Sequence, residues 1–106
     1  MQKGDNMANK NYQAGRRKEW QVQEMLEKVG YKTTRSSGSH GLWDVCAVNE
    51  NEVRLIQVKY TEGNGIGISE VDLEPFELFK VPMNTSKELW TFKKGNNIPN
   101  IKEIGG

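Results

Sequence analysis

The sequence has one cysteine, three prolines and no long apolar run, and these absences exclude several classes of protein. A single thiol, Cys46, excludes an internal disulfide and a zinc site built on cysteines. No stretch approaches the roughly 20 apolar residues that cross a bilayer, and the first residues do not form the apolar core of a secretory signal. We therefore expect no membrane partner and a cytoplasmic protein, in the host cytoplasm if the source is viral.

Length and charge narrow the expectation further. The chain has 106 residues, 27% of them charged and 35% hydrophobic, which fits one domain with a small core. The net charge is only +1, but residues 1–18 sum to +4 and the remaining 88 residues to −3. Such a basic segment suits a polyanion such as nucleic acid, although a solvated tail would give the same pattern. We expect residues 1–10 to be a flexible basic arm and residues 11–106 to be a single domain.

Apolar spacing predicts a first helix followed by a meander of strands. Residues 22, 25, 26 and 29 are apolar at the spacing of one helix face, which predicts a helix from about Asn11 to Val29. Three segments of strand character follow, separated by turn-forming residues. They are Tyr31–Ser36, Leu42–Val48 and Val53–Tyr60. In the third, strand alternation places Gln57 and Lys59 on one face.

The second half predicts one more helix and one more strand. Asp72 is positioned to cap a helix that ends before Pro82, with Phe76 and Phe79 directed to the core. A strand at 88–93 then completes a right-handed crossover and should run parallel to the third strand. The glycine-rich stretch 62–67 is expected to be flexible, and residues 98–104 are either a further strand or a tail. The order α-β-β-β-α-β gives an α/β (α+β) fold with a central mixed sheet flanked by helices.

Four polar residues fall where this fold brings its elements together. Glu19 shares the apolar stripe of the first helix, and Asp44 stands near the start of the second strand. Gln57 and Lys59 interrupt an otherwise apolar strand, where polar groups need partners. Two carboxylates and an amide oxygen form a sparse donor set for Mg²⁺, or alternatively Mn²⁺, and a nearby lysine could activate water. We expect Asp44 and Lys59 to share one pocket beneath the first helix.

Five short motifs in the order of the chain resemble those of the PD-(D/E)xK nuclease superfamily, most closely the Holliday junction resolvases of archaeal and viral type. They are Gly15-Arg16-Arg17-Lys18-Glu19, Leu26-Glu27-Lys28-Val29-Gly30-Tyr31, Arg35-Ser36-Ser37-Gly38-Ser39, Trp43-Asp44-Val45 and Gln57-Val58-Lys59. The similarity covers about residues 11–61. It implies a restriction-endonuclease-like core.

The resemblance also implies roles for individual residues. Glu19 matches the acid of the first helix, Asp44 the metal-binding aspartate and Lys59 the catalytic lysine of the family. Gln57 stands where the family usually has a second metal-binding acid, so the site loses a negative charge and metal affinity should fall. Eight residues are predicted to contact DNA: Arg16, Arg17, Lys18, Arg35, Ser36, Ser37, Ser39 and His40.

These features together predict a magnesium-dependent, structure-selective DNA endonuclease. The most specific version is a Holliday junction resolvase acting as a homodimer on branched DNA, because a junction needs two symmetric nicks. Three alternatives remain open at this point. They are a non-catalytic DNA-binding module with the nuclease fold, a restriction or repair endonuclease acting on duplex DNA, and an α/β interaction domain with no nucleic-acid role.

Overall fold

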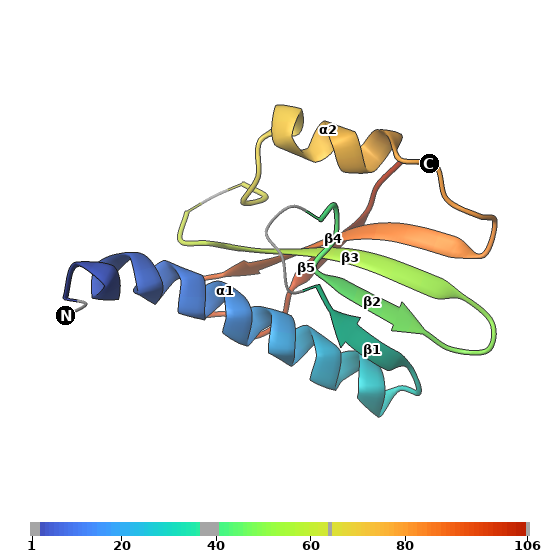
Figure 1. Cartoon of the computed structure of the whole chain (residues 1–106), viewed down its shortest axis with the longest axis horizontal. Helices are drawn as coiled ribbons and strands as arrows, with labels where there is room; N and C mark the ends of the chain where they lie inside the picture. The colour runs from blue at the N-terminus through green and yellow to red at the C-terminus, as the bar shows by residue number, and fades with distance from the viewer. Residues whose placement is uncertain (1–2, 37–40, 64, 106) are drawn as a thin grey trace.

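The computed structural model describes residues 3–36, 41–63 and 65–105, with side chains described from residue 16 onward. Seven elements occur along the chain (Figure 1). They are α1 (Lys3–Lys28), β1 (Lys32–Arg35), β2 (Val45–Val48), β3 (Val53–Thr61), α2 (Glu70–Leu78), β4 (Thr85–Lys93) and β5 (Asn100–Glu103). No helix in the described part of the chain is long and apolar enough to cross a membrane.

The five strands form one mixed sheet in chain order. Strands β1, β2 and β3 pair antiparallel, β3 and β4 pair parallel, and β5 returns antiparallel to β4. The two helices cover opposite faces, with α1 on one side and α2, within the β3–β4 connection, on the other (Figure 1). The predicted mixed sheet flanked by helices is confirmed, and it has the restriction-endonuclease-like α+β arrangement.

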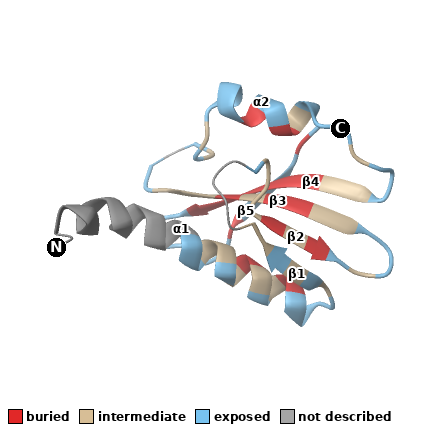
Figure 2. Cartoon of the chain, in the orientation of Figure 1, coloured by how far each residue is buried: buried red, intermediate tan, exposed pale blue. Residues whose placement is uncertain are grey.

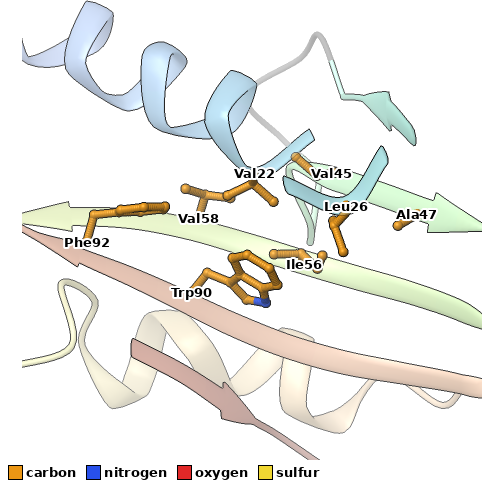
Figure 3. Close-up of a cluster of buried hydrophobic side chains, with 8 residues drawn as sticks. All are labelled: Val22, Leu26, Val45, Ala47, Ile56, Val58, Trp90 and Phe92. Atoms are coloured by element: carbon orange, nitrogen blue, oxygen red, sulfur yellow. The ribbon is translucent and has the colours of Figure 1, made fainter. Parts of the chain in front are cut away.

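The helix α1 buries one stripe against the sheet. Val22 and Leu26 are buried there and pack over Ile56, Val58 and Trp90 (Figure 3). From residue 16 onward, the outer surface of the helix is mostly exposed (Figure 2). The helix begins at Lys3, not near Asn11 as expected, so the basic segment continues the helix rather than preceding it. The apolar stripe gave no signal for this start because it begins only at residue 22.

The helix α2 packs on the other face through Leu73 and Phe76. Two expectations for this helix are wrong. Its cap is Ser69, whose Oγ accepts a hydrogen bond from the backbone N–H of Asp72 at 3.1 Å, so Asp72 lies inside the first turn. Phe79 was expected in the core but is 42% exposed, because the helix ends at Leu78 and the chain turns there.

The strands confirm most of the sequence pattern and settle one open alternative. In β3 the predicted alternation holds, with Leu55 facing α2 and Ile56 facing α1. The fourth strand begins at Thr85, earlier than the predicted residue 88. Residues 100–103 form the edge strand β5. Near the end of the glycine-rich stretch, Thr91 Oγ1 donates a hydrogen bond to the carbonyl of Ile66 at 2.8 Å, which ties this residue to β4.

Candidate active site

Asp44 lies directly before β2 and is held by three hydrogen bonds. Its backbone N–H donates to the carbonyl of Ile56, and its own carbonyl accepts from Ser36, both at 2.8 Å. Its side-chain Oδ2 accepts from the backbone N–H of Val58, also at 2.8 Å. The carboxylate therefore accepts the hydrogen bond that a backbone carbonyl of a neighbouring strand would otherwise accept from β3. This anchoring fixes the Asp44 side chain between β1 and β3.

Glu19 approaches the same place from α1. Arg35, at the end of β1, donates from Nη1 to Glu19 Oε1 at 3.3 Å, and both side chains are partly buried. The sheet register places Arg35 opposite Val45, the residue that follows Asp44. The helix acid, the strand cation and Asp44 thus meet where β1 and β2 lie against α1.

The charges of these residues interact. Burial raises the pKa of Glu19, and the negative charge of Asp44 raises it further, while Arg35 and Arg16 lower it. Burial also raises the pKa of Asp44, against the opposing effects of the Val58 hydrogen bond and the charges of Lys59 and Arg35. The charge of Asp44 therefore acts on the pKa of Glu19, and the charge of Lys59 acts on the pKa of Asp44. Two acids held in a partly dehydrated place repel each other, and a bound cation would relieve that repulsion.

Lys59 and Gln57 reach the site from the other face of the sheet. Strand alternation places both on the side of β3 that faces α2, because Leu55 packs against that helix. The Cβ of Lys59 is closely covered by Gly67, where an added Cβ would lie 2.9 Å away. The position beneath the first helix that was expected for Lys59 is therefore wrong. That Asp44 and Lys59 share one pocket stays a prediction.

The donor set fits a divalent cation that retains much of its water. Asp44 has one oxygen bound to the Val58 N–H, and Glu19 has one bound to Arg35. Each carboxylate keeps a second oxygen, and Mg²⁺ is commonly held in proteins by one or two carboxylates. No group of three or more acidic, histidine or cysteine ligands occurs among the described residues. Gln57 is half-buried, and no hydrogen bond of its amide is recorded in the described ranges.

Comparison with known protein families gives one match. The model of the archaeal Holliday junction resolvase (Hjc) family matches residues 10–98. The chain belongs to this family. The Hjc family is of the PD-(D/E)xK nuclease type, so the resemblance found in the motifs is confirmed and extends through β4. Searches of the curated proteins and of the solved structures return no match.

The predicted DNA-binding residues of this Hjc family member do not lie at one place. Arg16, Arg17 and Arg35 line a surface cavity together with two residues of α1. Lys18 lies apart from them, with its Nζ 5.0 Å from the centre of the Phe92 ring. The backbone of Ser36 donates to Asp44, so this residue positions the site acid. Ser37, Ser39 and His40 lie outside the described residues.

Sequence reasoning missed Trp20. The sequence-based list of DNA-binding residues does not contain it, but its side chain is 69% exposed and lines the same cavity as the three arginines. Its exposure could have been predicted from the helical spacing, because residue 20 lies outside the apolar stripe formed by Val22 and Leu26. Trp43, by contrast, packs between α2 and the sheet, with its ring centre 6.4 Å from that of Phe76.

Proposed function

We propose that this member of the Hjc family is a metal-dependent endonuclease that nicks branched DNA, and that its substrate is the four-way Holliday junction. Family membership over residues 10–98 supports a nuclease and DNA recombination. The observation that carries the proposal is the hydrogen bond at 2.8 Å from the Val58 N–H to Asp44 Oδ2, because it holds this carboxylate against β3 between the positions of Gln57 and Lys59. The ion pair of Glu19 with Arg35 at 3.3 Å supports the assignment of a second acid to the same site.

Each residue of the site has a chemical task in this proposal. Asp44 and Glu19 would hold Mg²⁺, with the oxygen of Gln57 as a weaker ligand. The ion, when bound, supplies Lewis-acid stabilisation of the charge that develops on the scissile phosphate. Lys59 orients or deprotonates the attacking water and offsets negative charge in the transition state. Arg35 keeps Glu19 in place and presents its remaining donors to a phosphate oxygen.

The proposed substrate requires two active sites. One chain carries one site, and a junction is resolved by two symmetric nicks, so we propose a homodimer with twofold symmetry. Recognition would rest on phosphate positions and DNA shape more than on base edges.

The direct test compares two DNAs of matched sequence, a labelled four-way junction and a linear duplex. With Mg²⁺ we expect paired nicks in the junction alone, and no product with chelator. Asp44→Asn keeps the acceptor for the Val58 N–H but removes the charge, and should slow cleavage by about a hundredfold or more. Asp72→Asn makes the same chemical change on exposed α2 and should cleave normally. Equal cleavage of the linear duplex would instead assign a restriction or repair endonuclease.

A second candidate is a DNA-binding module without catalytic activity. Gln57 favours it, because a neutral amide stands at a position where the family usually has an acid. This candidate predicts that the wild-type protein binds the junction but releases no product at any Mg²⁺ or Mn²⁺ concentration. It also predicts that Asp44→Asn and Lys59→Met bind as the wild type does. Any metal-dependent nick that Asp44→Asn abolishes would rule this candidate out.

A further inference from the structure

A cationic cavity with an exposed indole lies beside the candidate active site. It has a volume of about 310 Å³ and is lined by Arg16, Arg17, Trp20, Gln23 and Arg35. Four of these residues come from α1, and the spacing of residues 16, 20 and 23 places them on one side of the helix. Arg35 contributes the opposite wall from β1. The volume is at the lower end of the range for sites that hold small organic groups, about 300 to 1,000 Å³.

The position of Trp20 in this cavity needs an explanation. A tryptophan side chain usually buries most of its large apolar surface, yet Trp20 is 69% exposed. By contrast, Trp90 is 2% exposed and donates its indole N–H to Glu88 at 2.8 Å. Trp20 has no comparable packing in the described part of the chain, and its ring forms a wall of a cavity that three guanidinium groups share.

The chemistry of the cavity matches a single nucleotide. Guanidinium groups bind phosphate oxygens through paired hydrogen bonds, and they stack on rings. An exposed indole offers a flat surface on which any base can stack. Gln23 adds an amide whose Nε2 donates to Thr33 Oγ1 at 3.1 Å, so its carbonyl oxygen is left to accept from a base. An anion without a ring would use the arginines and leave the indole without a partner.

The cavity is continuous with the catalytic groups. Arg35 belongs to both, since it lines the cavity and donates to Glu19 at 3.3 Å. Trp20 directly follows Glu19 in the chain. A nucleotide in this cavity would therefore lie next to the phosphate that the site cuts.

We infer that this cavity binds one unstacked nucleotide of the DNA beside the scissile phosphate, with Trp20 stacking on its base. The inference rests on the proposed endonuclease function and adds a source of selectivity to it. Extracting a base from a continuous duplex costs a few kcal/mol, and the cost is least where pairing is already lost. The bases at a four-way branch point are still paired, but their stacking is interrupted on one side, so unstacking a base there costs less than inside a linear duplex. Trp20 is thus a specificity-determining residue that favours branched over linear DNA.

The test measures binding in chelator, so that it does not depend on cleavage. Fluorescence anisotropy gives dissociation constants for a labelled four-way junction and for a linear duplex of the same sequence. We expect Trp20→Ala to weaken junction binding by about tenfold, within the range measured for loss of base stacking, and to change duplex binding less than twofold. Trp20→Phe retains a ring and should restore most of the preference. Val71→Ala, an exposed apolar residue on α2, should bind both DNAs as the wild type does.

The outcomes separate this inference from the proposed function. Equal loss of affinity for both DNAs, or no loss, would overturn the role of Trp20 while leaving the nuclease proposal intact. If the wild-type protein binds neither DNA, the proposed function fails and the inference fails with it. As a second measurement, a 5-iodouracil placed at the branch point should crosslink to Trp20 under near-ultraviolet light. A crosslink found only on other residues would place the base elsewhere.

Discussion

At the scale of a single residue, Gln57 raises the question of whether a neutral amide weakens the proposed metal site. It occupies the face of β3 shared with Lys59, and a carboxylate at this position would add a charged oxygen ligand to the two carboxylates of the proposed metal site. We expect Gln57→Glu to lower the Mg²⁺ concentration for half-maximal cleavage by about tenfold, because ligand charge strongly tunes affinity for hard cations. Asn51→Asp adds the same charge in the exposed β2–β3 turn and serves as the control. An unchanged Mg²⁺ requirement in Gln57→Glu would show that the amide is no handicap.

Glu88 is an acid that stabilises the fold, and its lowered pKa predicts that the free energy of unfolding depends on pH. Burial alone would raise its pKa, but hydrogen bonds from Arg54, Ser86 and Trp90 outweigh burial and lower the pKa below its ordinary value of 4.5. Arg54 donates to both carboxylate oxygens, at 2.9 and 2.8 Å. The stabilisation is therefore fully present above about pH 4.5 and is lost as the pH falls through the lower, folded-state pKa.

We expect Glu88→Gln to lower the free energy of unfolding by about 1 to 3 kcal/mol at pH 7. The difference from wild type should shrink as the pH falls from 5 toward 3, because protonation removes the same charge from Glu88. Urea unfolding across this range measures it. Glu19 and Asp44 are present in both proteins, so their raised pKa values cancel in the difference. A difference independent of pH would contradict the assignment.

The chemistry-bearing residues were largely predictable from the sequence, and the surface ones were not. An acid on an apolar stripe and a polar pair in an apolar strand are local conflicts, and such conflicts mark sites. Glu19 was found in this way, while Asp44 was found from its place near the start of the second strand and from its motif. The exposure of Trp20 depends on which part of the α1 surface the neighbouring strand covers. Whether Lys59 lies on the same side of the sheet as α1 likewise depends on which helix covers which face.

At the scale of elements, α2 shows how one strand stabilises a helix end. The last turn of α2 has no basic residue, and its local cap is the backbone N–H of Phe79, which donates to the carbonyl of Phe76 at 3.3 Å. Lys87 of β4 supplies the charge from across the layer. Its Nζ donates to the carbonyls of Phe76, Glu77 and Phe79 at 3.0, 2.5 and 2.6 Å, and the side chain is only 5% exposed.

We expect Lys87→Met to lower the free energy of unfolding by about 2 to 4 kcal/mol, because three carbonyl acceptors lose a charged donor. Methionine retains most of the volume of the lysine stem, so the loss reports on the ammonium group. Lys80→Met changes an exposed lysine just after the same helix and should have little effect. Urea denaturation of the three proteins measures this. Equal stability of Lys87→Met and wild type would show that water can replace the ammonium group.

Some boundaries of the helices and strands follow from nearby residues in the sequence, and others depend on residues of a different layer. Strand alternation and turn residues placed β1 to β4 within a few residues of their observed positions. The choice of Ser69 over Asp72 as the cap of α2 was within reach of the sequence, since both residue types cap helices. The capping of α2 by Lys87 was not, because it joins residues 8 to 11 positions apart on different layers.

At the scale of the whole molecule, charge is divided between the two helical layers. Residues 1–18, all but two of them in α1, sum to +4, while α2 exposes Glu70, Asp72 and Glu74 on the opposite face of the sheet. This arrangement orients a polyanion toward α1 and away from α2, and it was visible in the sequence once the helices were assigned to opposite faces. A net charge of +1 hides it completely.

The charge division predicts how DNA binding responds to salt. Each phosphate contact on B-form DNA contributes about 0.9 to the slope of log affinity against log salt concentration. The double variant Arg16→Gln and Arg17→Gln should therefore reduce the slope by up to about 1.8, and it should do so on linear duplex as well as on junctions. Lys80→Gln with Lys102→Gln removes the same charge from exposed positions after α2 and on β5, and should leave the slope nearly unchanged. Equal slopes for the two double variants would mean that net charge attracts the DNA, with no preferred layer, and would contradict docking on α1.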